Sequence, residues 1–418
     1  MSNIKFGWIQ GFLEEIEEDD DDKRIVDYFG IANYTEKLAD KILPNINTRY
    51  HSIKYYFLII IGIDIITKYL KSKFKKEKEN AYDRAEIYES SFKNYLEKNF
   101  DNYMQYFEYI VARLLNNQGE KSFIGINYIK KYNKFLKLKQ IEKSKILVRK
   151  HFLKRKISYA YDRYKTSLER IKWINDDYEY DEKSGSILTT EGKKILKLIK
   201  ENKRNLYDEL QETFENENKT EKNKLKIKFN KKIYKKLKDC LFENQISKKI
   251  YKEISNYPNN ENLIKYLPNN KNLQNDERKT IKEIEAIYNS FKPLEDILQK
   301  IKEKKKKKIN LDELEKDVKN INIKSNIKDN IENINDSDIE EFLKKLKKSS
   351  NLKEILERIN ERIEEKKHIR IFKEIKKDSI KIEKKIIDKF FKRDGFKPTN
   401  FRLDVAKRFV EEYKKCKK

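Results

Sequence analysis

Glycine and proline are scarce in this chain of 418 residues, with nine and five copies. A chain built on many tight turns needs both, because glycine supplies left-handed backbone conformations and proline fixes φ. Lys, Glu, Ile and Leu are abundant instead, which favours helices joined by short polar connections. We therefore expect a mostly α protein. Since 40% of the residues are charged and 37% are hydrophobic, its cores should be small and elongated.

Cysteine and histidine are scarce as well. Only Cys240 and Cys416 occur, without a nearby cysteine or histidine cluster, so neither a disulfide framework nor a zinc site is supported. Three histidines limit acid–base catalysis, and the chain has no glycine-rich phosphate loop, Walker pattern or GxSxG motif. We expect no cofactor and no metal, and the sequence favours a non-enzymatic protein.

No apolar run is long enough for a bilayer. The most apolar stretch, Tyr55 to Ile66, is interrupted by Asp64 and falls short of the roughly 20 residues that a membrane helix needs. We interpret it as a buried core helix. The first residues are acidic where a signal peptide has a basic segment, so we expect a cytoplasmic protein without a membrane partner.

Positive charge dominates the composition. Lys and Arg number 98 against 71 Asp and Glu, which gives a formal net charge of +27. A polyanion would relieve this self-repulsion, so we predict a nucleic acid as partner, DNA in preference to RNA. Two alternatives stay open. Lys, Asn, Ile and Tyr belong to AT-rich codons, so part of the excess can reflect genome composition, and an acidic membrane surface would also attract the chain.

Sequence patterns divide the chain into three parts. Residues 1–135 hold most of the glycines and many aromatic residues, and predict a compact N-terminal helical domain in which Glu86 to Leu115 has the apolar spacing of amphipathic helices. Residues 136–215 predict a basic helix plus a winged-helix-like unit. Residues 216–418 predict an elongated Lys-rich helical region with a short coiled coil.

The predicted nucleic-acid-binding residues lie between Lys143 and Lys156. A helix would hold seven basic side chains here in fixed register around the apolar residues Ile146, Leu147 and Leu153. We predict phosphate contact by Lys143, Lys145, Arg149, Lys150, Lys154, Arg155 and Lys156.

A helix and a hairpin follow this basic segment. Ser158 to Ile174 has helical apolar spacing, a turn at Gly185 could close a two-stranded wing from Tyr178 to Leu188, and Thr189 or Thr190 could cap the next helix. This order is compatible with a winged module, and an ordinary loop before a helix is the alternative. Phosphate contact should come from the basic helix, because the wing is acidic. Its acidic residues are Asp176, Asp177, Glu179, Asp181 and Glu182.

Helix start signals mark the third part. Ser337 to Glu340 predicts a capping box, and Asn351 with Glu354 opens a longer helix with regularly spaced apolar residues. A helical hairpin or short coiled coil is expected. The run from Lys302 to Lys308 has the charge to meet phosphates, although such runs are most often solvated linkers.

Three segments near the N-terminus share a pattern with known sequences. They are Phe6 to Ile9 (FGWI), Phe29 to Phe57, and Phe123 to Asn127 (FIGIN). In order and spacing they resemble a group of uncharacterised prokaryotic proteins with a G-W-I start, an L-G-I segment, a proline-centred turn and an arginine–tyrosine–aromatic run. The matching residues are Gly7, Trp8, Gly30, Ile31 and Pro44.

Two positions depart from the pattern: Asn45 replaces an expected glycine and Lys54 an expected arginine. The resemblance covers the first third of the chain and implies a setting more than an activity. Such proteins are found beside Swi/Snf-type helicases with phospholipase-D-like nuclease domains in defence or mobile-element loci. The resemblance carries over no catalytic residue.

Two nuclease patterns occur at spacings that composition alone can produce. Arg362 and His368 fit the arginine–histidine spacing of HEPN-type ribonucleases, whose two side chains share a cleft at the scissile phosphate. A PD-(D/E)xK nuclease needs an acidic residue and an E-x-K strand, so that carboxylates hold Mg²⁺. Glu374 to Lys376 has that spacing in a stretch that predicts a helix, and Glu182 with Lys183 offers a second candidate.

The sequence therefore predicts a non-enzymatic, nucleic-acid-associated accessory protein of a prokaryotic helicase–nuclease defence or mobile-element system. Its protein partner would be a helicase or nuclease. The alternatives are a metal-dependent or HEPN-type nuclease, and a structural adaptor that binds a protein partner through its C-terminal helices.

Overall fold

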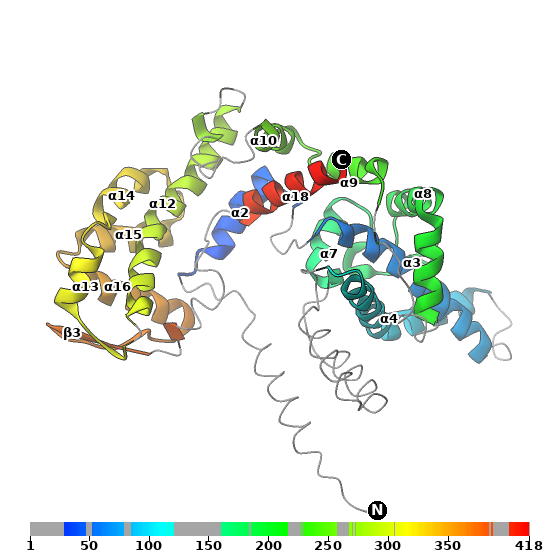
Figure 1. Cartoon of the computed structure of the whole chain (residues 1–418), viewed down its shortest axis with the longest axis horizontal. Helices are drawn as coiled ribbons and strands as arrows, with labels where there is room; N and C mark the ends of the chain where they lie inside the picture. Colours follow the sequence, from blue (N-terminus) through cyan, green and yellow to red (C-terminus); the bar gives the residue numbers. More distant parts are fainter. Residues whose placement is uncertain are drawn as a thin grey trace, which may run out of the picture. The chain divides into compact units, whose positions relative to one another are not determined.

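The computed structural model describes residues 29–46, 52–78, 85–120, 160–183, 185–215, 227, 229–256, 267–269, 271, 273–304, 306–383, 386–387 and 401–417. Most of these residues are helical, as Figure 1 shows, so the prediction of a mostly α fold is confirmed. The described chain also contains a small three-stranded sheet.

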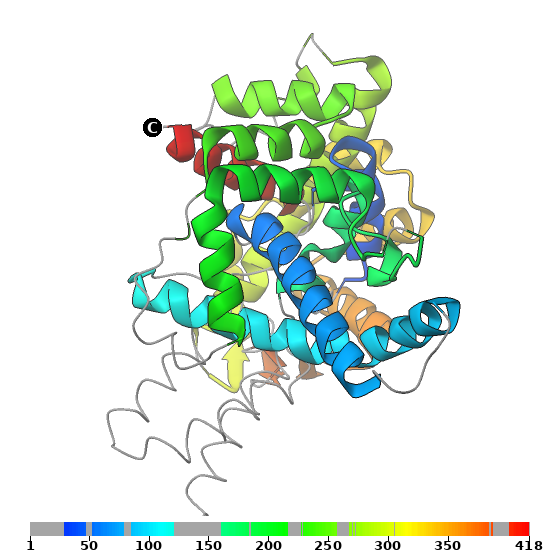
Figure 2. The same cartoon turned by 90° about the vertical axis from the view of Figure 1, so that its right-hand side faces the viewer.

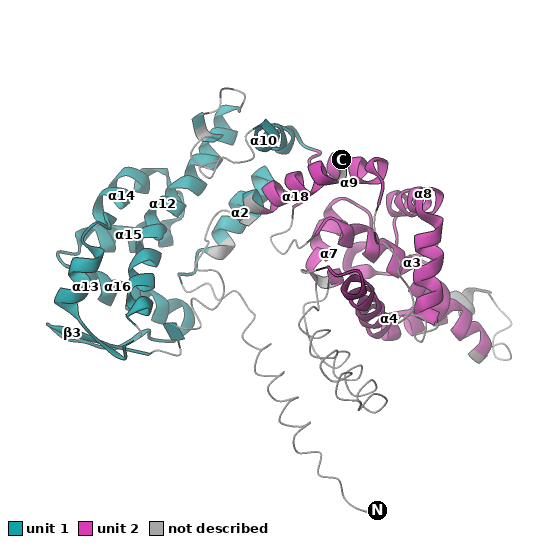
Figure 3. Ribbon diagram, viewed as in Figure 1, with its two compact units in different colours: residues 1–44, 244–404 teal, residues 45–243, 405–418 magenta. Residues whose placement is uncertain are grey.

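The chain forms two compact units, coloured separately in Figure 3. Unit 1 comprises residues 1–44 and 244–404, and unit 2 comprises residues 45–243 and 405–418. Each unit joins segments that are far apart in the sequence. This division differs from the three consecutive parts expected from sequence, because packing between distant segments, not a change of composition, defines it.

Unit 2 is built around helix α3 (Lys54–Lys78). The stretch from Tyr55 to Ile66 is buried except for half-buried Asp64, so the prediction of a core helix is confirmed. Helix α4 (Ala85–Asn117) packs closely on α3 at Gly62, where a Cβ atom would lie 2.7 Å from the ring of Phe107. No helix in the described part of the chain has both the length and the apolar composition to cross a bilayer.

Helix α7 (Ala160–Arg170) is capped by a side chain from α4. Glu108 is buried and accepts hydrogen bonds from the backbone N–H groups of Ala160 at 2.8 Å and Tyr161 at 2.7 Å. A carboxylate at this end satisfies N–H groups that lack helical partners. The apolar residues predicted to face the core from this helix are buried, namely Tyr161, Tyr164, Leu168 and Ile171.

The remaining elements of unit 2 are the 3-10 helix η1 (Asp176–Tyr178), α8 (Thr190–Glu215), α9 (Lys231–Leu241) and most of α18 (Phe401–Lys417). Helix α18 begins in the last residues of unit 1. Within unit 2 its Glu412 accepts hydrogen bonds from Ser52 Oγ at 2.6 Å and from Ile53 N at 3.0 Å, just before α3 begins.

Unit 1 is organised by the long helix α12 (Asn275–Glu303). Helices α2 (Ala32–Ile42) and α14 (Ile323–Asn330), with the 3-10 helices η3 (Leu267–Asn269) and η4 (Ile331–Asn333), pack on it. Buried Glu283 of α12 accepts hydrogen bonds from the Tyr34 hydroxyl and from Asn335 N. Helices α10 (Gln245–Asn256) and α13 (Leu311–Val318) also belong to this unit.

A helical hairpin closes unit 1, as predicted. Helix α15 (Ser337–Lys348) packs on α16 (Leu352–Lys367). Asn351 caps α16 by accepting from Glu354 N, which confirms the predicted start. The cap of α15 is Asp336 rather than the predicted Ser337, because the Asp336 side chain accepts from Ile339 N and Ser337 is already helical.

The sheet corrects one prediction and locates part of the lysine run. Strand β3 (Ser379–Ile382) lies between β1 (Lys308–Asn310) and β2 (Phe372–Ile375), antiparallel to both. Glu374 was expected in a helix and lies in β2. In so short a run the helical and strand periods are hard to distinguish, and cross-strand packing of buried Ile309, Ile380 and Ile382 decides. Lys308 is a sheet residue, not part of a linker.

Candidate nucleic-acid interface

All seven residues predicted to contact phosphates lie outside the described residues, because the structure describes nothing between residues 120 and 160. Their role from Lys143 to Lys156 stays a prediction. The described part of unit 2 has another basic surface, on α8 and α9, which we did not predict. We call it the α8–α9 surface and define it by its exposed cations: Lys194, Lys197, Arg204, Lys231, Lys232, Lys235 and Lys236.

Helix α8 divides into two parts of opposite charge. Residues 190–204 hold six basic residues against Glu191 and Glu201, whereas residues 205–215 hold four acidic residues and no Lys or Arg. The backbone leaves helical geometry at Lys203, with φ −146° and ψ 43°, and Figure 1 shows α8 changing direction along its length. The bend therefore falls where the sign of the charge changes.

The side chain of Asn202 explains the position of the bend. Its Nδ2 donates to the Leu198 carbonyl at 2.7 Å, one helical turn back, and so competes with the backbone ladder. Its Oδ1 accepts from Asn230 Nδ2 at 2.8 Å, and Asn230 is the N-cap of α9. The same amide thus loosens α8 and joins it to α9.

Asp64 of α3 connects both parts of α8. Its Oδ2 accepts from Lys200 Nζ at 2.8 Å, before the bend, and from the Tyr207 hydroxyl, after it. Lys68, one turn along α3, lies 2.9 Å from the same oxygen and donates to the Tyr207 hydroxyl at 3.1 Å. Lys200 Nζ also lies 4.3 Å from the centroid of the Tyr207 ring. The one polar residue in the apolar stretch of α3 therefore fixes the bent helix.

Burial and these contacts together shift the pKa values of Asp64, Lys200 and Tyr207. Burial alone would raise the pKa of Asp64, but the hydrogen bonds from Lys200, Tyr207 and Lys68 outweigh it and hold that pKa below its ordinary value. Burial lowers the pKa of Lys200, against the opposing effect of Asp64. Burial and the hydrogen bond to Asp64 raise the pKa of Tyr207. Asp64 is therefore a carboxylate at neutral pH.

The start of α8 is fixed by close backbone packing. Thr189 Oγ1 accepts from Gly192 N at 3.1 Å, which confirms the predicted threonine cap. A Cβ atom at Gly192 would lie 1.9 Å from the Trp173 carbonyl oxygen, so only glycine fits there. Trp173 is itself placed by the end of α7, where Lys172 has φ 57° and Trp173 N donates to the Leu168 carbonyl at 2.9 Å.

Helix α9 runs antiparallel to the first part of α8. Its N-cap bonds to Asn202 near the bend, and Lys236 further along lies close enough to Glu191 to contribute to the lowered pKa of that carboxyl, after the larger effect of Lys194. In Figure 2 the first part of α8 is the lowest of the stacked green helices, and α9 lies directly above it. One face of α9 is buried through Ile233, Tyr234, Leu237 and Leu241.

The opposite face of α9 carries four exposed lysines in two i, i+4 rows. Lys231 and Lys235 form one row, and Lys232 and Lys236 the other, with about 6 Å along the axis between members. No acidic side chain in the described chain forms an ion pair with Lys231, Lys232 or Lys235. Like charges at this spacing weaken a helix.

Helix stability does not explain these lysines. The first turn of α9 has no acidic residue, in contrast to α12, α13 and α15 but like α2, α10 and α14. The positive end of the helix dipole disfavours Lys231 and Lys232 at this position and favours an anion. The arrangement is suited to an external polyanion.

The hairpin before α8 is present in reduced form. Single antiparallel bridges join Ile174 to Leu188 and Asp181 to Ser186, and Gly185 has φ 61° in the turn. A hollow of about 800 Å³ beside it is lined by Asp176, Glu179, Asp181 and other polar residues. Two acidic residues of the hairpin segment form ion pairs, Glu179 with Lys93 and Asp177 with Lys165. Whether the unit is winged stays a prediction, because the basic helix lies outside the described residues.

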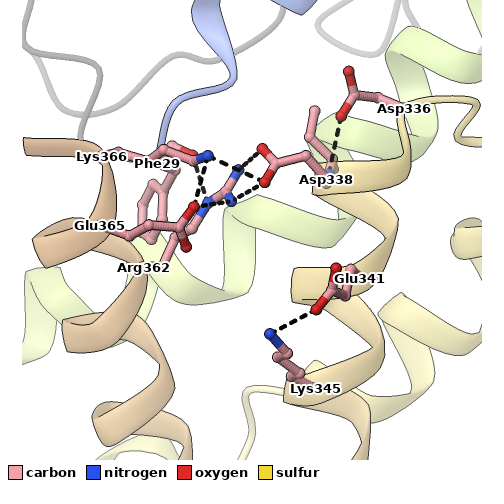
Figure 4. Close-up of polar contacts among 9 residues, drawn as sticks. Phe29, Asp336, Asp338, Glu341, Lys345, Arg362, Glu365 and Lys366 are labelled. Carbon is pink, nitrogen blue, oxygen red and sulfur yellow. Dashed lines mark hydrogen bonds and ion pairs between the residues drawn. The ribbon is translucent and has the colours of Figure 1, made fainter.

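Arg362, the arginine of the HEPN-type pattern, is buried and bonded to other parts of unit 1 (Figure 4). Its side chain is 2% exposed, Nε donates to the Phe29 carbonyl at 2.9 Å, and Nη1 and Nη2 donate to Asp338 at 2.8 and 2.7 Å. His368 is an exposed residue that ends α16 in the left-handed conformation, with φ 55°. The geometry gives Arg362 a structural role and does not present it to a substrate.

The E-x-K spacing expected of a PD-(D/E)xK nuclease lies on a strand, as that fold requires, but no cluster of metal ligands surrounds it in the described chain. Glu374 lies in β2 and pairs with Lys376 at 3.0 Å. Among the described residues no group of three His, Cys, Asp or Glu side chains could hold a metal ion.

A pattern in the sequence could have predicted the α9 part of the α8–α9 surface. Asn230 followed by KKIYKKLKDCL combines a helix cap with lysines on one helical face and apolar residues on the other. The Asp64 cluster has only an indirect signal, a lone acid in an apolar run. No family model, curated protein or solved structure matches the chain.

Proposed function

We propose that this protein is a non-enzymatic nucleic-acid-associated accessory protein, and that the α8–α9 surface contacts the phosphate backbone. The observation that carries the proposal is the face of α9 with Lys231, Lys232, Lys235 and Lys236 exposed, the first two of them in the first turn at the positive end of the helix. The net charge of +27 supports the same partner. Placement beside a helicase–nuclease system rests on the N-terminal resemblance alone.

This surface supports contact with phosphates and not the reading of bases. The aromatic residues of α8 and α9, which are Tyr207, Phe214 and Tyr234, are all buried, and the residues that define the surface are Lys and Arg. Stacking on bases therefore has no platform here. Binding should show little sequence preference and a steep dependence on salt, because each contact releases counterions.

The test measures the affinity of the full chain for a DNA duplex by fluorescence anisotropy between about 50 and 200 mM salt. Replacing Lys231, Lys232, Lys235 and Lys236 by Gln should flatten the slope of log affinity against log salt by about three to four units, at about 0.9 per contact. A matched variant replaces four ion-paired lysines of unit 1 with Gln. These are Lys300, Lys344, Lys345 and Lys353.

The matched variant should change the slope far less, although it removes the same charge. Equal slopes for the two variants would assign binding to net charge and remove the α8–α9 surface from the proposal. A wild-type chain that fails to bind at 50 mM salt would overturn the proposed partner. Incubation with DNA or RNA and Mg²⁺ tests the nuclease alternative, for which cleavage would be the decisive result.

A further inference from the structure

The sheet of unit 1 places two lysines directly opposite each other. Lys308 of β1 and Lys381 of β3 are cross-strand partners, and both are exposed. Ile382 N donates to the Lys307 carbonyl at 2.8 Å and Leu311 N to the Asp378 carbonyl at 2.9 Å. Since bonded pairs alternate in an antiparallel ladder, Lys308 and Lys381 form a non-hydrogen-bonded pair, the arrangement with the closest side chains.

The acidic side chain opposite this sheet lysine pair has another ion-pair partner in the structure. Like charges opposite each other weaken a sheet. Glu374 of β2 is the other cross-strand partner of Lys381, but its carboxylate pairs with Lys376 at 3.0 Å. In the described chain no ion pair involves Lys308 or Lys381. Lys306 and Lys307, just before β1, are exposed as well and add to the positive charge.

Protection of a sheet edge explains only half of the pair. Lysines on edge strands hinder the addition of further strands, and β1 is an edge. Lys381 lies on β3, which is the central strand and needs no such protection. Edge protection therefore accounts for Lys308 but not for Lys381.

We propose that the sheet lysine pair is a second phosphate-binding site for nucleic acid, separate from the α8–α9 surface. This inference rests on the proposed function. Among possible polyanions a nucleic acid fits best, because the neighbouring solvent-facing residues Asn310 and Ser379 are polar and uncharged, and the carboxylate of Glu374 is paired with Lys376. A protein interface or insertion into a membrane would bury apolar or aromatic side chains, and this face of the sheet exposes none.

The experiment uses the full chain with both lysines replaced, Lys308→Gln with Lys381→Gln, and a control with Lys345→Gln and Lys353→Gln. The control lysines belong to the same unit and pair with Glu341 and Glu357. Duplex affinity is measured against salt. Two lost contacts should flatten the slope of log affinity against log salt by about 1.8 units. The ratio of wild-type affinity to variant affinity should therefore fall by about twelvefold between 50 and 200 mM salt. The control slope should stay close to that of the wild type.

Each outcome decides the inference. A sheet variant that behaves like its control overturns it, and the proposed function survives if the four α9 substitutions still flatten the slope. Absence of wild-type binding overturns both. Vesicles of phosphatidylserine test the rival partner, and binding to them that disappears in the sheet variant, with duplex affinity unchanged, assigns the pair to a membrane surface. Circular dichroism should show normal folding, because both substituted side chains are exposed.

Discussion

Replacing Asp338 by Ala should destabilise the protein more than replacing its partner Arg362 by Met, although Asp338 is the more exposed of the two. The side chain of Arg362 is 2% exposed and that of Asp338 is 49% exposed. Loss of the aspartate leaves a buried guanidinium whose nearest remaining carboxylate, Glu365, is 3.9 Å away. A buried charge that loses its partner typically costs about 3–5 kcal/mol, and we expect the lower end because the Phe29 carbonyl still accepts from Nε.

Loss of the arginine leaves a carboxylate that water can reach. Asp338 also keeps Lys366, whose Nζ is 3.1 Å away. The Arg362→Met variant then loses mainly the hydrogen bond to the Phe29 carbonyl, at about 1–2 kcal/mol, while Met retains packing against the Phe342 ring, 5.2 Å from the guanidinium. Urea unfolding followed by circular dichroism measures the difference.

The double variant and a surface control complete this test. Asp338→Ala combined with Arg362→Met should be no less stable than Asp338→Ala alone, because no buried charge remains. Glu361→Ala removes an exposed ion pair with Arg358 and should change stability by less than about 0.5 kcal/mol. If Arg362→Met is the more destabilising single change, the argument from stranded charge is wrong.

Three further predictions follow from described contacts. The hydrogen bond from Arg362 holds the pKa of Asp338 at about 2, so the stability that ionised Asp338 provides should be complete above about pH 4 and fall as the pH approaches 2. After solvent screening this contribution is about 1 kcal/mol. In the Asp338→Asn variant the free energy of unfolding should therefore fall less steeply between about pH 4 and about pH 2. Gly192→Ala should cost at least about 3 kcal/mol in urea unfolding, because its Cβ meets the Trp173 carbonyl, whereas Gly119→Ala, with φ 73° and open space, should cost about 1 kcal/mol. Asp64→Asn should cost about 2–3 kcal/mol, since Lys200 and Lys68 lose their carboxylate, and a variant as stable as the wild type would show that the Asp64 cluster does not hold α8.

Local signals predicted the elements that local forces determine. The apolar stretch of α3, the apolar spacing of α7 and the Asn351 cap of α16 all depend on residues within a few turns of one another. The Ser337 cap failed by one residue because Asp336 offers the same chemistry one position earlier.

Features that depend on distant residues were not predictable in this way. Unit 1 joins residues near Phe29 to residues beyond 244, and the Phe29–Arg362 bond spans 333 positions. The strand role of Glu374 depends on pairing with β3, which a short Lys-rich run does not reveal. The bend of α8 depends on Asp64 of α3 and on Asn230, the N-cap of α9. The sequence of α8 alone would therefore predict one continuous helix.

Under the proposed function, the bend of α8 would also limit how much of a duplex this surface can follow. The basic part, residues 190–204, measures about 22 Å at 1.5 Å per residue, which is the length of about six to seven base pairs. Past Lys203 the helix changes direction and presents Asp208, Glu209, Glu212 and Glu215, which repel a phosphate backbone. Under the proposed function we therefore expect the α8–α9 surface by itself to cover a short stretch of duplex with a defined end.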